Sequence, residues 1–102
     1  MTDIRLPEDC ETMADVRAGV DRTDRELMEL LDRRFGYMRA AARIKPTRDA
    51  VRDEDRKAEV IANAVADAGT RNLPAEELEA IWDRLVEASI AYEMTIWDDL
   101  RK

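Results

Sequence analysis

The stretch that decides the fold runs from Thr12 to Lys45 and has the sequence TMADVRAGVDRTDRELMELLDRRFGYMRAAARIK. Apolar residues recur along it at steps of three and four, which predicts a single amphipathic helix over about 12–45. Thr12 with Asp15 resembles the capping box that starts a helix, with Asp in place of the usual Glu. The apolar stripe consists of Met13, Val16, Val20, Leu27, Leu30 or Leu31, Met38, and Ala41 or Ala42. A helix of this kind gains most of its stability by packing its apolar side against another helix, so we expect it to have a partner.

Three cations, Arg17, Arg34 and Lys45, lie on or beside this stripe. Lys45 closes the stripe immediately before Pro46, whose ring disfavours helical geometry in the preceding residue and therefore ends the helix. A charged group on a face that packs against protein needs a partner of opposite charge. These cations are therefore the first candidates for a binding site.

Two further helices are predicted after the long one. Asp53 supplies an acidic start to a helix over about 54–69, which Gly69 is expected to end. Asn72 and Pro74 are expected to open a third helix over about 74–101, whose first turn contains acidic residues. The chain is therefore predicted to be all-α, with three helices.

The length of the chain limits it to one small domain, which we expect to span residues 1–102. A helix of thirty residues is about 45 Å long, which exceeds the size of a compact domain of about 100 residues. Charged residues make up 40% of the chain, a proportion that suits a helical protein with hydrated outer faces. We therefore expect the long helix to pack in an oligomer.

The composition excludes several classes of function. Lys and Arg number 17 against 24 Asp and Glu, and the net charge of −7 argues against binding to nucleic acid. With one cysteine and no histidine, the chain cannot build a disulfide framework, a His-containing metal site or a Cys–His or Ser–His nucleophile pair. It has neither a signal-peptide pattern nor an apolar run long enough to span a membrane. A cytoplasmic enzyme or binding module is expected.

Polar residues also interrupt the apolar faces of the later helices. The full inward-facing set consists of Arg17, Arg34, Lys45, Arg56, Ser89 and Glu93. One carboxylate cannot neutralise four cations, so a small dianionic ligand would supply the missing negative charge, and arginine suits bidentate binding of carboxylates. The alternative is a purely structural network of ion pairs between the helices.

Helical geometry limits which cations can share a ligand. Arg34 and Lys45 are 11 residues apart, which places them within roughly 20° of each other and about 16 Å apart along the axis, within reach of one ligand. Arg17 precedes Arg34 by 17 residues, about 25 Å along the axis and turned by roughly 100°. A second chain, packed antiparallel about a two-fold axis, would therefore have to supply Arg17.

Five separated motifs carry these residues. They are Ala14-Asp15-Val16-Arg17 with Val20-Asp21 and Asp24, Arg33-Arg34, Lys45, Val51-Arg52-Asp53-Glu54-Asp55-Arg56, and Glu87-Ala88-Ser89-Ile90 with Glu93. Together they resemble the small all-α chorismate mutases and their relatives, the isochorismate-pyruvate lyases. The resemblance covers nearly the whole chain and implies an intertwined homodimer of three-helix chains. It implies the rearrangement of chorismate to prephenate in aromatic amino-acid biosynthesis, without cofactor, metal or covalent intermediate.

The resemblance also implies roles by position. Arg17 of the partner subunit and Arg34 correspond to the ligands of the two substrate carboxylates. Arg56 and Ser89 correspond to residues that assist on the same groups. Lys45 corresponds to the donor to the ether oxygen, where negative charge develops as the C–O bond breaks. Such a site holds the enolpyruvyl arm over the ring in a compact conformer.

Asp53 matches a position that contributes to recognition of the substrate hydroxyl, but two other positions depart from the commonest pattern. Lys57 stands where many mutases have an acidic residue that binds the ring hydroxyl, and it can donate to that hydroxyl, pair with Glu93 or point to water. Glu93 stands where many members have glutamine. A carboxylate there repels the developing charge unless it is protonated, so we expect activity to fall as pH rises.

Two alternatives to the mutase remain open. The opening Pro7-Glu8-Asp9-Cys10 resembles that of the isochorismate-pyruvate lyase branch, which forms salicylate and pyruvate in a related site. The other alternative is a non-catalytic helical dimer or interaction domain, in which the cations serve only in salt bridges. Substrate assays and ligand stabilisation separate these three hypotheses.

Overall fold

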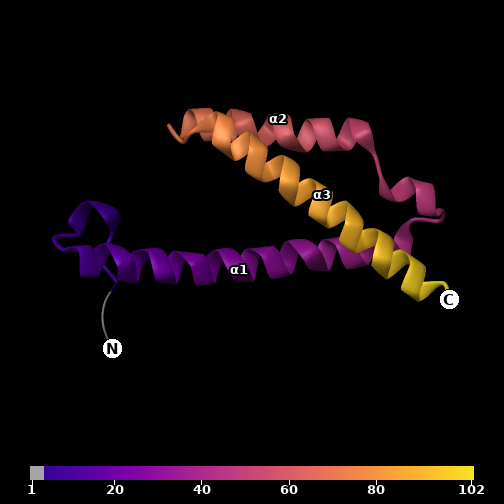
Figure 1. The fold of residues 1–102 in the computed structure, drawn as a ribbon, viewed down its shortest axis with the longest axis horizontal. Coiled ribbons are helices and arrows are strands. Elements are labelled where there is room, and N and C mark those ends of the chain that lie inside the picture. Colours follow the sequence, from indigo (N-terminus) through magenta and orange to yellow (C-terminus); the bar gives the residue numbers. More distant parts are fainter. Residues whose placement is uncertain (1–3) are drawn as a thin grey trace. The chain divides into compact units, whose positions relative to one another are not determined.

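The computed structural model describes residues 4–102, so the first three residues of the chain lie outside the described part. The described residues form helices and no strand, which confirms the all-α class and the three long helices (Figure 1). The elements in order are η1 (Pro7–Asp9), α1 (Met13–Ile44), η2 (Arg48–Val51), α2 (Glu54–Thr70) and α3 (Ala75–Leu100). The two short 3-10 helices lie outside the three helices that the sequence predicted.

The start of α1 is fixed by a reciprocal cap between Thr12 and Asp15. The backbone N–H of Asp15 donates to Thr12 Oγ1 at 3.1 Å, and that of Thr12 donates to Asp15 Oδ2 at 3.2 Å. The backbone N–H of Glu11 donates to the same carboxylate oxygen, and this hydrogen bond is the main reason that the pKa of Asp15 lies below its ordinary value. This is a capping box with Asp in place of Glu, as the sequence predicted.

The end of α2 differs from the prediction, because Asn72 caps this helix rather than opening the next. Asn72 has a positive φ of 56°, and its N–H donates to Gly69 O while the N–H of Leu73 donates to Ala68 O. This pattern of two bonds around a left-handed residue is the Schellman motif. Asparagine tolerates the left-handed region better than most residues, so α2 continues past Gly69 to Thr70.

The chain divides into two compact units, one ending at Phe35 and one beginning at Gly36. In the second unit α2 packs against α3, and η2 contacts α3. All of the buried residues among 4–102 belong to this unit, and they are Ala42, Val51, Ala68, Val86, Ser89 and Glu93. The core is therefore small, and two of its members are polar.

The first unit contains no buried residue among its described residues, 4–35. The apolar stripe of α1 is open instead, with exposed fractions of 59% for Met13, 52% for Val20 and 51% for Leu27. No helix among the described residues has both the length and the apolar character needed to cross a membrane. The stripe is thus apolar enough to pack against protein but remains uncovered in the single chain.

Candidate functional site

Two predicted site residues, Lys45 and Glu93, form an ion pair in the second unit. Lys45 directly follows α1, and Glu93 lies on α3. The Lys45 Nζ lies 2.8 Å from Glu93 Oε2 and also donates to the backbone carbonyl of Val51 at 3.4 Å. The Glu93 side chain is 5% exposed and the Lys45 side chain 29% exposed. A buried carboxyl group therefore holds the ammonium group of a partly exposed lysine side chain.

The Glu93 carboxyl group is not saturated by this contact. Its Oε2 is buried and, although within ion-pair distance of Lys45, receives no hydrogen bond from any of the residues that the structure describes. Buried polar atoms in proteins are nearly always hydrogen-bonded, so an exception calls for an explanation. A ligand that hydrogen-bonds to this oxygen would provide one.

Ser89 lies one turn before Glu93 on α3 and is 4% exposed. Its Oγ donates to the backbone carbonyl of Leu85 at 2.7 Å, the usual back-bond of a serine within a helix. Residues four apart on a helix share a face, so Ser89 and Glu93 place two polar groups next to each other in the core. The structure confirms that both residues point inward.

The start of α2 holds Asp53 and Arg56. Asp53 is the N-cap of this helix, because its Oδ1 accepts from the backbone N–H of Arg56 at 3.0 Å. The Arg56 side chain forms an ion pair with Glu59 and is 63% exposed, so the prediction that it faces inward is wrong. Asp53 thus has the structural role at the start of α2 that the sequence indicated. The roles of Asp53 and Arg56 toward a substrate remain predictions.

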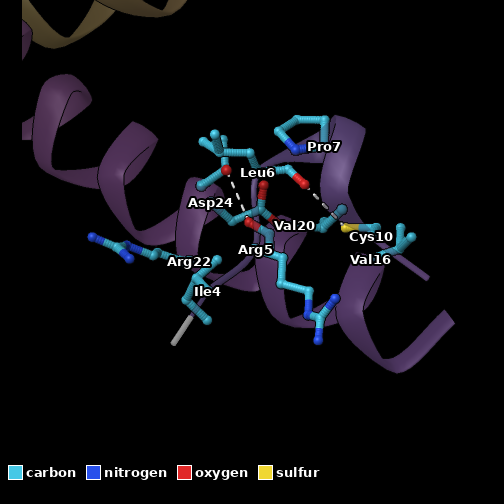
Figure 2. Close-up of a pocket in the computed structure, with 11 residues that line it drawn as sticks. Ile4, Arg5, Leu6, Pro7, Cys10, Val16, Val20, Arg22 and Asp24 are labelled. Carbon is cyan, nitrogen blue, oxygen red and sulfur yellow. Dashed lines mark hydrogen bonds between the residues drawn. The ribbon is translucent and has the colours of Figure 1, made fainter. Parts of the chain in front are cut away.

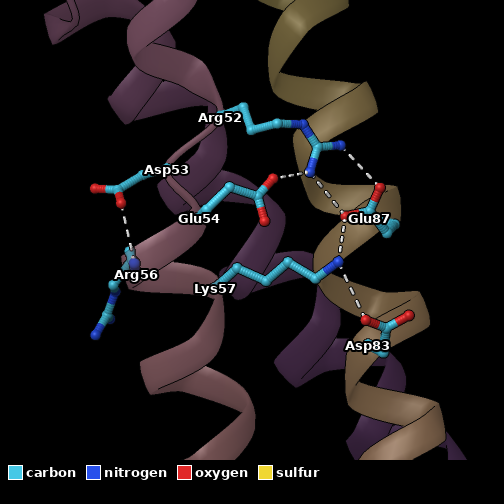
Figure 3. A network of polar contacts seen from close by, with 7 residues as sticks. All are labelled: Arg52, Asp53, Glu54, Arg56, Lys57, Asp83 and Glu87. Atoms are coloured by element: carbon cyan, nitrogen blue, oxygen red, sulfur yellow. Dashed lines mark hydrogen bonds and ion pairs between the residues drawn. The ribbon is translucent and has the colours of Figure 1, made fainter.

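Lys57 belongs to a network of charges between the start of α2 and the middle of α3 (Figure 3). Its Nζ lies 2.8 Å from Glu87 Oε2 and 3.1 Å from Asp83 Oδ1. Arg52 binds the same Glu87 carboxylate with two hydrogen bonds, of 2.8 and 3.1 Å. The described partners of Lys57 are therefore Glu87 and Asp83, and not Glu93 as one alternative proposed.

Glu87 is the centre of this network, although the sequence pattern did not single it out. The hydrogen bonds from Arg52, followed by those from Lys57, lower the pKa of the Glu87 carboxyl group from 4.5 to about 2. The hydrogen bond to Glu87, followed by that to Asp83, raises the pKa of Lys57. The available signal was the spacing of Asp83 and Glu87, which are four residues apart and face one side of α3.

We expect Glu87→Gln to destabilise the protein in a way that depends on pH. A carboxyl group whose pKa is lowered by folding stabilises the fold at pH values above its unfolded pKa, near 4.5. This contribution is lost as the pH falls toward the folded value of about 2. Urea unfolding midpoints should therefore be lower for E87Q at pH 7 and should converge with wild type near pH 2.

Glu79→Gln is the matched control for this experiment, since Glu79 is an exposed residue of the same helix. It should leave the midpoint close to wild type at every pH. A difference between E87Q and wild type that stays constant from pH 7 to pH 2 would show that the ion pairs of Glu87 do not contribute to stability.

Arg17 and Arg34 lie on α1 in the first unit, apart from the unit that holds Lys45 and Glu93. Arg17 is exposed, and its guanidinium group has no ion-pair or hydrogen-bond partner among residues 4–102. Arg34 is half-buried. Their convergence with Lys45 therefore remains a prediction from the sequence.

A pocket of about 540 Å³ lies in the first unit, between α1 and the residues that precede it, from Ile4 to Cys10 (Figure 2). Its walls are mainly apolar, with Leu6, Pro7, Val16 and Val20 among the lining residues. None of the eight predicted site residues lines it. The pocket is therefore distinct from the candidate site.

Comparison with known proteins finds two similarities. The family model of chorismate mutase type II matches residues 16–94, a segment that contains every predicted site residue. The chain is also similar to the isochorismate pyruvate lyase of Pseudomonas aeruginosa. The two proteins are 30% identical over 98 residues, which are 96% of this chain and 97% of that protein.

Proposed function

The chain belongs to the chorismate mutase type II family, and from this premise we propose that it catalyses the rearrangement of chorismate to prephenate. The observation that carries the proposal is the Lys45–Glu93 pair, in which a buried carboxyl group holds the ammonium group of a partly exposed lysine side chain. Such a cation is suited to an oxygen atom on which negative charge develops. The reaction needs no nucleophile, in keeping with a chain that has no histidine.

In the proposed mechanism, the cations bind the substrate at three points. Arg34 and Arg17 of the partner subunit bind the two carboxylates, since the planar guanidinium group matches carboxylate geometry. This binding holds the enolpyruvyl arm above the ring, so that the new C–C bond can form as the ether C–O bond breaks. Lys45 donates a hydrogen bond to the ether oxygen and stabilises its developing charge.

The partner subunit in this mechanism is a second copy of the chain. Support for it comes from the first unit, where no residue among 4–35 is buried and the apolar stripe of α1 is open. Burying such side chains stabilises a protein by roughly 25 cal/mol for each Å² of apolar surface. A homodimer in which each chain donates Arg17 to the other site would cover the stripe and complete two equivalent sites.

The lyase reaction is a second candidate, because a specific observation favours it. The chain is similar over nearly its full length to a protein described as an isochorismate pyruvate lyase. In addition, the ammonium group of Lys57 has donors only, and it is paired with Glu87 and Asp83. This position therefore offers no acceptor for a ring hydroxyl. Both reactions break the same kind of ether bond, and Lys45 would serve either of them.

A paired assay with chorismate and with isochorismate tests both candidates. Loss of chorismate absorbance with formation of prephenate, and without salicylate fluorescence, would support the mutase. Salicylate formation with a much higher kcat/KM would support the lyase. Turnover of neither substrate would overturn the proposal and favour a non-catalytic helical dimer.

We expect Glu93→Gln to flatten the pH profile of the reaction. Only a protonated carboxyl group can donate a hydrogen bond, and an ionised one beside Lys45 repels the charge that develops on the ether oxygen. We therefore predict that wild-type kcat/KM falls as the pH rises. The amide of glutamine does not titrate, so the variant should lose this slope.

Profiles of kcat/KM against pH for wild type, E93Q and the surface control Glu79→Gln provide the measurement. The control should retain the wild-type slope, since Glu79 is exposed and lies outside the site. An E93Q profile that matches wild type would mean that Glu93 does not govern the pH dependence.

A further inference from the structure

Two residues of α3 and the residue that caps its C-terminus, spaced at intervals of four, contact both the side chain and the backbone of Lys45. Glu93 holds the side chain, with 2.8 Å between its Oε2 and Lys45 Nζ. Trp97 and Arg101 hold the backbone, since the indole Nε1–H and the guanidinium Nη2–H each donate to the Lys45 carbonyl at 3.0 Å. Residues spaced in this way form one row along a helix. One row of side chains, along α3 and its C-cap residue, therefore contacts both the side chain and the backbone of Lys45.

The end of α1 explains why these donors are needed. The last carbonyl groups of a helix have no N–H partner within the helix. Pro46, which follows Lys45, cannot donate to any of them because proline has no backbone N–H. The Nη1–H of Arg101 donates to a second such carbonyl, that of Ala42, at 3.0 Å. Ala42 is fully buried, so its carbonyl group has little access to water. Side chains from the end of α3 and its C-cap residue thus donate hydrogen bonds to the backbone carbonyl groups at the end of α1.

Trp97 and Arg101 also support each other. The Arg101 guanidinium lies over the Trp97 ring, with 4.2 Å from Cζ to the ring centroid, a cation–π arrangement. A positive charge at the C-terminal end of a helix is favourable toward the helix dipole. Trp97 and Arg101 therefore act as one unit, which we call the clamp, and not as two independent contacts.

We propose that Trp97 and Arg101 are positioning residues that set the location of the Lys45 ammonium group for catalysis. The inference rests on the proposed function, because it assigns Lys45 to the reacting ether oxygen. A lysine side chain is long and flexible, so its reach to a small target depends on where its backbone is fixed. A displacement of about 1 Å in a catalytic group can reduce a rate by roughly a hundredfold.

The test compares Arg101→Met and Trp97→Phe with wild type on the substrate that wild type converts. R101M removes both hydrogen-bond donors and the charge, and we expect kcat to fall at least tenfold with little change in KM, since the carboxylate-binding arginines remain. W97F removes the indole N–H together with the five-membered ring but keeps an aromatic ring, and we expect a decrease of about fivefold, the equivalent of one hydrogen bond. Arg71→Met is the matched control, because Arg71 is 67% exposed and pairs with Asp67.

A double-mutant cycle distinguishes positioning from general stability. If Arg101 acts through Lys45, R101M should cause no further loss of activity in a Lys45→Ala background. A merely structural role predicts the same fractional loss in both backgrounds. Hydrogen exchange at the Lys45 amide, which donates to Ala41 O at 2.9 Å, should be faster in R101M than in wild type and R71M.

The outcomes separate this inference from the proposed function. Active wild type with unchanged kcat in R101M and W97F would overturn the clamp and leave the proposed function standing. Wild type that converts neither chorismate nor isochorismate would overturn the proposed function and, with it, the catalytic role of the clamp. A loss of kcat that disappears in the Lys45→Ala background, together with faster exchange, would support the clamp.

Discussion

Replacing Lys45 by alanine is expected to lower kcat/KM by roughly two to three orders of magnitude, the usual effect of removing a donor from a site of developing negative charge. The ammonium group lies 2.8 Å from Oε2 of the buried Glu93 carboxyl group. Without it, the ether oxygen loses its proposed donor and Glu93 loses this ion-pair partner. Steady-state kinetics with the substrate that wild type converts provide the measurement.

This variant also changes stability, so the experiment needs a second substitution. Lys45→Ala leaves a buried carboxylate without its ion-pair partner, which destabilises a protein. Adding Glu93→Gln removes that charge and should restore the unfolding midpoint. It should not restore activity, because the donor to the ether oxygen is still absent. Recovery of activity together with stability would instead show that Lys45 serves only the structure.

Mixing inactive Arg17→Ala with inactive Arg34→Ala is expected to restore about a quarter of wild-type activity. In the proposed dimer each site takes Arg34 from one chain and Arg17 from the other, so a mixed dimer contains one intact site and one doubly altered site. Random exchange makes about half of the dimers mixed. Activity should rise from the background of either variant as subunits exchange.

The control is a mixture of Arg34→Ala with Lys45→Ala, two residues that the proposal places in the same site on the same chain. Each mixed dimer then has one altered residue in each site, so activity should stay at background. Subunit exchange is followed independently with differently labelled chains. Complete exchange without recovery in the Arg17 and Arg34 mixture would refute the donation of Arg17 across the interface.

The sequence predicted the parts of the fold that depend on local chemistry. The period of the apolar residues gave the three helices, and Thr12 with Asp15 gave the start of α1, since a cap involves neighbours within one turn. The prediction that Gly69 ends α2 was wrong, because both Gly69 and Asn72 suit a helix C-terminus. The positive φ of Asn72 shows which of the two adopts the left-handed conformation.

The contacts that the sequence did not predict join distant parts of the chain. Glu87 meets Lys57 across 30 residues, and Trp97 meets Lys45 across 52. Such pairs depend on how α2 and the end of α1 are aligned against α3, which the helical period of each segment does not specify. The inward position of Glu93 was predictable, because it interrupts an apolar stripe. Its ion pair with Lys45 required the tertiary structure.

The open stripe of α1 has a consequence for how the protein behaves at low concentration. No residue among 4–35 is fully buried within one chain. In the proposed dimer, association therefore supplies the core of the first unit and the remote arginine of each site in a single step. Dilution that separates the chains would then unfold that unit and abolish both sites together. Specific activity becomes a function of the amount of protein present, and substrate, by bridging two chains, opposes their separation.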